Sequence, residues 1–261
     1  MNEPMTTQIA LTLIGGPTAL IEIAGFRLLT DPTFDQPGSY QSGPVRLEKT
    51  EGPAKSADDL GEVSAVLLSH DQHFDNLDRA GRSFLDRVPV TLTTEAGGER
   101  LGRNARPLKP FETTELAGEG GGRLMITATP ARHGPAGYEP ISGPVIGFLI
   151  GLAEPGDAIY ATGDTVWYDG IAEVARRYAP RLVIPFVGSA EPRGPFRVTM
   201  DSNDTIEVAH AFPQAQIAAV HNRGWAHFKE SQSDLARAFE YLGIGSRLTT
   251  LLPGQVVRFE L

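Results

Sequence analysis

The sequence contains no cysteine, and this absence removes three kinds of chemistry at once. A disulfide framework, a thiolate nucleophile and a zinc site built on cysteine are all excluded. Any metal ion must therefore be held by histidine and carboxylate side chains.

Basic residues are also scarce, since 23 Lys and Arg stand against 32 Asp and Glu, for a net charge of -9. They are dispersed along the chain, whereas contacts to a phosphate backbone need clustered Lys and Arg. We therefore expect no nucleic-acid partner, and a small molecule as the substrate.

Long apolar runs are missing as well, because no stretch approaches the roughly 18 apolar residues of a membrane helix. Residues 1–10, MNEPMTTQIA, lack the basic residues and the long apolar core of a signal peptide. These features predict a cytoplasmic protein with no membrane partner, and they leave a homo-oligomer open.

The sequence does contain short β-branched runs bounded by Gly, Pro and Asp. At 261 residues and 41% hydrophobic it can bury a large core, and no boundary divides it, so a single domain over residues 1–261 is expected. Strands dominate the first half, where Ala24-Gly25 between two apolar runs predicts a hairpin turn. In the second half, strands alternate with helices predicted near 168–178, 202–212 and 232–242.

Two stretches are too rich in Pro, Gly and Ser to predict regular structure. Residues 33–60 form a long loop of the kind that is often functional, and a lid is one interpretation. Residues 188–201 are similar, with Arg193 and Arg197 as their only cations.

Residues of metal-ligand type follow four of the predicted strands. His70, His73 and Asp75 come after 63–69, His133 after 124–131, Asp164 at the end of 157–163, and His221 at the end of 215–220. Ligands at strand ends are held by the sheet, so they can converge on one rim. The chain has only six histidines, and four of them in such places indicate a metal site. Imidazole with carboxylate suits zinc, and also manganese or iron.

Each of these residues also has an ordinary interpretation. A lone His after a strand is more often a turn residue than a ligand, and Asp164 alone could cap the following helix. His210 lies within an amphipathic stretch and is interpreted as structural. His227 lies six residues beyond His221 and is expected to line the cleft as an acid or hydrogen-bond donor.

With these residues in place, the sequence resembles the metallo-β-lactamase superfamily over nearly its whole length. That family has a His-x-His-x-Asp-His motif after a strand, then single His, Asp and His ligands at later strand ends. Here HFDN supplies His73, Asp75 and Asn76, and His133, Asp164 and His221 follow in the same order. The opening LIGGPTALIEIAGFRLLTDPTF and the ending HNRGWAHF are similar to the branch of ascorbate-6-phosphate lactonase-like hydrolases. The resemblance implies a four-layer αββα sandwich of two mixed β-sheets flanked by helices.

The first motif departs from the family pattern. His70 and His73 are three residues apart instead of two, so either His70 remains the ligand beside an inserted residue or Asp71 takes the first position. Asn76 replaces the last histidine, and a neutral amide is a poorer ligand. One divalent ion is therefore expected rather than two.

The resemblance implies a metal-dependent hydrolase that uses a metal-activated water on a lactone, ester, amide or phosphoester. Asp75 would orient that water and take its proton. The alternative, which Asn76 favours, is a member of the fold that binds a ligand or partner without turnover at a degenerate metal site.

Overall fold

The computed structural model describes residues 8–118 and 121–260 of the chain. The prediction that residues 1–10 carry no signal peptide falls mostly on residues outside these ranges. Within the described ranges, no helix is both long enough and apolar enough to cross a membrane.

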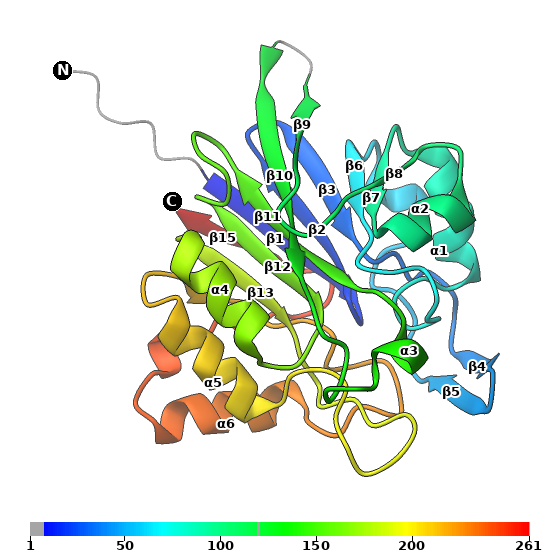
Figure 1. Cartoon of the computed structure of the whole chain (residues 1–261), viewed down its shortest axis with the longest axis vertical. Coiled ribbons are helices and arrows are strands. Elements are labelled where there is room, and N and C mark those ends of the chain that lie inside the picture. Colours follow the sequence, from blue (N-terminus) through cyan, green and yellow to red (C-terminus); the bar gives the residue numbers. More distant parts are fainter. Residues whose placement is uncertain (1–7, 119–120, 261) are drawn as a thin grey trace.

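Two mixed β-sheets form the centre of the molecule (Figure 1). The first has the strand order β15 (Val256–Glu260), β1 (Gln8–Gly15), β2 (Thr18–Ile23), β3 (Phe26–Thr30), β6 (Ala65–Leu67), β7 (Thr91–Thr93) and β8 (Ala105–Pro107). The second has the order β14 (Gln216–Ile217), β13 (Leu182–Phe186), β12 (Ile159–Asp164), β11 (Ile146–Gly151), β10 (Arg123–Pro130) and β9 (Thr113–Ala117). In each sheet, parallel pairs at one end meet antiparallel pairs at the other.

Helices cover the outer faces of both sheets (Figure 1). They are α1 (Arg79–Phe84) and α2 (Glu95–Leu101) beside the first sheet, and α4 (Asp169–Arg177), α5 (Ser202–Ala211) and α6 (Gln232–Tyr241) beside the second; α3 (Glu139–Ser142) is a short turn of helix near the site. Apolar side chains of both sheets, such as Leu11 and Phe148, bury one another in a common core. A separate apolar layer joins α4, α5 and α6 to the second sheet, and another joins α1 to the first. The predicted αββα sandwich is confirmed.

Local signals explain several of these elements. Ala24 and Gly25 both have positive φ, at 48° and 82°, as a tight hairpin turn between β2 and β3 requires. Ser231 and Asp234 form a capping box at the start of α6, where each side chain accepts from the other residue's backbone N–H.

The prediction of a structureless loop over 33–60 is wrong in part. This stretch contains a separate hairpin, β4 (Gly38–Ser42) paired with β5 (Val45–Lys49). Tyr40 and Leu47 face each other across the hairpin and pack on Trp225, which gives the strands an apolar face despite their polar composition. The stretch 188–201, between β13 and α5, has no regular element, as expected.

A buried ion pair fixes this hairpin to the start of α1. Lys49 Nζ lies 2.8 Å from Asp78 Oδ2, and both side chains are almost fully buried. The same carboxylate accepts the backbone N–H groups of Phe34, Asp35 and Gly81. Since each oxygen of Asp78 is satisfied, the hairpin has a defined place beside the strand ends.

Candidate metal centre

Three imidazoles and a carboxylate meet beyond the ends of β6, β10 and β12. The group comprises His70, His73, His133 and Asp164, and one ligand atom from each lies within 4.8 Å of all the others. His73 Nδ1 is 2.9 Å from His70 Nε2 and 3.2 Å from His133 Nε2. Ligands about 2.1 Å from one tetrahedral ion lie about 3.4 Å apart, so this group has the spacing of a single metal site.

Hydrogen bonds to the far ring nitrogens orient these imidazoles. His133 Nδ1 donates to the backbone carbonyl of Val198 at 2.7 Å, and His70 Nδ1 lies 2.8 Å from the Ser69 hydroxyl. The bond to Val198 fixes the ring of His133 and leaves its Nε2 with a lone pair toward the centre of the group, and the contact with Ser69 holds the ring of His70 in place.

A second group shares Asp164 with the first. It consists of Asp75, Asp164 and His221. His221 Nε2 lies 3.5 Å from Asp164 Oδ1 and 3.6 Å from Asp75 Oδ2, while its Nδ1 is 3.2 Å from the carbonyl of Val187. The two oxygens of Asp164 therefore face different groups, because Oδ2 lies toward His133 at 3.6 Å.

The backbone around these residues has little freedom. Gly163, just before Asp164, has φ of 63°, and a Cβ there would lie 2.5 Å from the carbonyl oxygen of Ile146. Only glycine fits this position. His221 itself has φ of 67°, an unusual conformation for a non-glycine residue, and its N–H donates to Gly16 O at 2.8 Å.

Buried polar atoms without partners lie at the point where the groups meet. Asp164 Oδ2 and His221 Nε2 have no hydrogen-bond partner among the described residues, and both side chains are fully buried. Leaving such atoms unpaired is costly; a cation in the first group would pair Asp164 Oδ2, and one in the second group would take the place of a proton on His221 Nε2. The donor set of imidazoles and carboxylates thus fits a divalent ion.

The two groups differ in protonation. Burial lowers the pKa of His70 well below its usual value and that of His73 to about 4, and neighbouring imidazoles act in the same direction. Burial also favours the neutral form of His221, but the carboxylates of Asp164 and Asp75 outweigh it and raise this pKa to about 9. At pH 7 His70 and His73 are neutral, whereas His221 carries a proton.

Of the two residues considered for the first position, the structure brings His70 into the group and turns Asp71 away. The carboxylate of Asp71 accepts from Arg100, with Nε at 2.8 Å from Oδ2, and its carbonyl accepts from Arg82. Asp71 is therefore occupied by a pair of arginines outside the group.

Asn76 lies between the two groups at the position of the missing histidine. Its Nδ2 donates to Asp164 Oδ1 at 3.2 Å, and its own carbonyl oxygen is buried with no partner among the described residues. The amide thus contacts the ligand that both groups share.

His227 reaches the second group from the segment after His221. Its Nε2 donates to Asp75 Oδ2 at 3.0 Å, and its Nδ1 has no partner in the described part of the chain. Burial favours the protonated form of Asp75, but the hydrogen bond from His227 and the nearby charge of His221 outweigh it and hold the pKa of Asp75 well below its usual value. His210, in contrast, is exposed on α5, away from both groups.

One buried acid next to the site was missed by the sequence analysis. Asp31 follows β3, and its Oδ1 accepts the N–H of Ser69 at 2.7 Å, immediately before His70. Burial, with the nearby charge of Asp164, raises the pKa of Asp31 well above its usual value. The signal was present, since Asp31 is another polar residue directly after an apolar strand.

A narrow cavity of about 40 Å³ opens onto the two groups. Its lining includes four residues of the site, His73, Asp75, His133 and His227. Side chains of the β4–β5 hairpin, of α3 and of the stretch 188–201 form the remaining walls. The cavity gives access from outside to these four residues.

Comparison with known proteins places this site in a family. The model of the beta-lactamase superfamily domain matches residues 26–222, which include all of the ligands described above. The chain belongs to this superfamily. Among curated proteins, it is 24% identical to the UPF0173 protein YddR of Bacillus subtilis over 95% of this chain and 99% of that protein.

Solved structures of the same fold include several hydrolases. An isothiocyanate hydrolase from Delia radicum gut bacteria is similar, with 25% identity, a TM-score of 0.80 and coverage of 97% of this chain and 100% of that one. A structure described as a possible metal-dependent hydrolase from Veillonella parvula has 21% identity and a TM-score of 0.83, over 95% and 98% of the two chains. The predicted family is confirmed, and the fold and the ligand groups together imply a divalent metal.

Proposed function

We propose that the protein is a metal-dependent hydrolase that acts on a lactone, ester, amide or phosphoester of a small molecule. The observation that carries this proposal is the meeting of two ligand groups at Asp164 beside a narrow cavity. Zinc suits the donors best, with manganese or iron as alternatives, and we expect one tightly held ion, bound by His70, His73, His133 and Asp164. Bound there, a divalent ion lowers the pKa of a water molecule to about 7 and polarises the group under attack.

Asp75 and His227 supply the proton chemistry in this proposal. Asp75 lines the cavity and stays ionised, so it can orient the attacking water. Its low pKa makes it a poor final acceptor for the proton. His227, which donates from Nε2 to Asp75, keeps a lone pair at Nδ1 that can take the proton and pass it to the leaving group.

The proposal is tested with protein purified without chelator. We expect about one metal equivalent per chain, hydrolysis of members of a panel of small lactones, esters, amides and phosphoesters, and loss of that activity on chelation. An isothiocyanate belongs in the panel because one similar structure is named for that substrate. His227→Ala should keep the metal and lose about 10²- to 10⁴-fold in kcat. Activity that survives removal of the metal would overturn the proposal.

Asn76 gives one reason to test the alternative of a ligand-binding protein without turnover. The amide occupies the place of a donor in the second group. A protein of this kind would bind small ligands in the cavity but hydrolyse none of the panel with its metal in place.

A further inference from the structure

The walls of the cavity are mostly apolar. They are formed by Val45, Leu47, Ile141, Ala190, Pro192 and Val198, with Ser42, Tyr138 and Arg193 as the polar residues away from the metal ligands. A substrate in this space would therefore have an apolar body, with its reacting group next to the histidines that line the cavity.

Arg193 is the one arginine or lysine in this lining, and among the described residues it forms no ion pair. Arg197, four residues further along the same stretch, pairs with Asp201 and Asp204, each at 3.0 Å. One arginine of the stretch thus stabilises the start of α5, while the other is exposed at the edge of the cavity and has no carboxylate partner in the described part of the chain.

The position of Arg193 is set by contacts on both sides of it. The N–H of Glu191 donates to the carbonyl of His227 at 3.1 Å, and Val198 N–H donates to Ala190 O at 2.9 Å. Phe196 packs edge-on against Tyr138, with ring centroids 5.2 Å apart. These contacts hold the stretch against the site.

The charge of Arg193 also acts on its neighbours in the cavity. Burial raises the pKa of Tyr138, and Arg193 opposes that rise. Arg193, Tyr138 and His73 all line the same cavity.

We propose that Arg193 binds a carboxylate of the substrate, so that the protein prefers small molecules with an apolar body and one carboxylate remote from the bond that is cleaved. This inference rests on the proposed hydrolase function. A guanidinium matches a carboxylate with two parallel hydrogen bonds. A phosphate dianion fits less well, because Arg193 is the one permanently charged cation in the lining. The chain has a net charge of -9, which repels anionic molecules. A local guanidinium group would attract a substrate with a carboxylate in spite of that repulsion.

Two esters with the same acyl chain length test this directly. 4-Nitrophenyl butyrate ends in a methyl group, and 4-nitrophenyl hemisuccinate has a carboxylate in its place. Arg193→Ala should lower kcat/KM for the hemisuccinate by about 10- to 100-fold, mainly through KM, and change that for the butyrate by less than about twofold. Arg193→Lys should recover part of the loss. Equal losses for both esters, or none for the hemisuccinate, would overturn the proposal.

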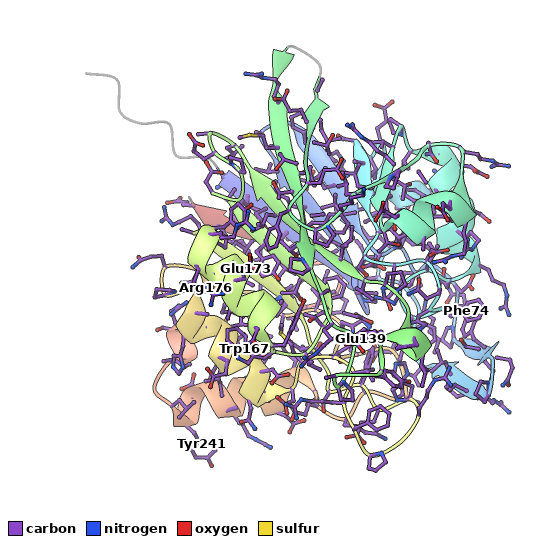
Figure 2. All side chains as sticks on the ribbon, viewed as in Figure 1. Phe74, Glu139, Trp167, Glu173, Arg176 and Tyr241 are labelled. Carbon is purple, nitrogen blue, oxygen red and sulfur yellow. The ribbon has the colours of Figure 1, made fainter. Side chains whose placement is uncertain are left out.

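Arg176 provides the matched control. It is an exposed arginine on α4, outside the cavity lining and on the other side of the molecule from Phe74 (Figure 2). Arg176→Ala removes the same charge and should leave both esters unaffected.

A binding measurement separates this inference from the proposed function. Monoethyl succinate is titrated calorimetrically into the wild type, Arg193→Ala and Arg176→Ala. Binding that is lost only in Arg193→Ala supports the carboxylate site, whether or not the esters are hydrolysed. A failure to hydrolyse either ester would count against the hydrolase function and not against this site. Equal binding by all three proteins, or no binding by the wild type, overturns it.

Discussion

The two ligand groups that meet at Asp164 differ in how readily they can bind a cation. The first contains three imidazoles, and burial lowers the pKa of His70 and of His73, the latter to about 4. The second contains two carboxylates and His221, whose pKa of about 9 keeps a proton between them. That proton partly balances the negative charge that a second cation would otherwise balance. The shared aspartate therefore does not make the two groups equivalent, because the other residues of each group determine how readily it binds a cation.

The largest effect should come from removing the shared ligand. Asp164→Ala deprives both groups of a carboxylate, so we expect metal content to fall from about one ion per chain to below about 0.1. His133→Ala should also lose the tightly held ion, since it removes a donor from the first group. Elemental analysis measures the ion, and circular dichroism shows whether the sandwich is intact.

His210→Ala is the control for these variants, because His210 is exposed and belongs to neither group. It should keep the metal. Full metal content in both Asp164→Ala and His133→Ala would remove the site as described.

The next effect concerns the first group alone. His70→Ala removes an imidazole whose Nε2 faces His73, so the tight ion should be lost or bound at least about tenfold more weakly. Asp71→Ala should retain the ion, because that carboxylate is paired with Arg100. Chelator competition on both variants measures the difference, and the reverse result would assign the ligand to Asp71.

A smaller effect is expected from restoring the missing donor of the second group. Asn76→His supplies an imidazole next to Asp164 and Asp75, so stoichiometry should rise from about one ion toward two. A wild-type protein that keeps two ions through prolonged dialysis would contradict this comparison.

The sequence was sufficient to find the residues that the structure brings together in the two groups, because strand ends are local features. His133 and Asp164 follow apolar runs that became β10 and β12, and a sheet brings such ends to one rim whatever the loops do. Asp31, in the Asp-Pro pair directly after β3, also follows an apolar strand and lies at the same rim.

The walls of the cavity could not be predicted in the same way. Val45 and Leu47 lie on a hairpin whose apolar face is defined only by packing on Trp225, and Tyr138 is the N-cap of a helix of one turn. Helix α2 was missed because its glycines, Gly97 and Gly98, disfavour a helix in sequence, yet both pack closely against neighbouring side chains. These features depend on partners that are distant in the chain.

The last effect is graded, and it compares the two groups by pH. A second ion must displace the proton of His221, so its apparent affinity should rise about tenfold per pH unit up to about pH 9 and then level off. Asp75 adds nothing to this slope, since its pKa is already well below the range. His73, with a pKa of about 4, is neutral in this range, and the pKa of His70 is also lowered well below its usual value, so neither adds slope to the first ion there. Competition titrations of Asn76→His at pH 6, 7, 8 and 9 would measure both.

The stability of the metal-free protein gives an independent check of the direction of the pKa shift of His221. Because the pKa of His221 is raised on folding, its contribution to stability is complete below the unfolded value of about 6.5 and is lost as pH rises through about 9. His73 acts oppositely: its lowered pKa costs stability as pH falls from about 6.5 through about 4. His221→Gln, which cannot be protonated, should therefore flatten the decline in unfolding free energy between pH 6.5 and 9 and leave the acid limb unchanged. Two results together would contradict the comparison: the same pH dependence of affinity for both ions, and the same decline in unfolding free energy in His221→Gln as in the wild type. They would show that the two groups do not differ in protonation.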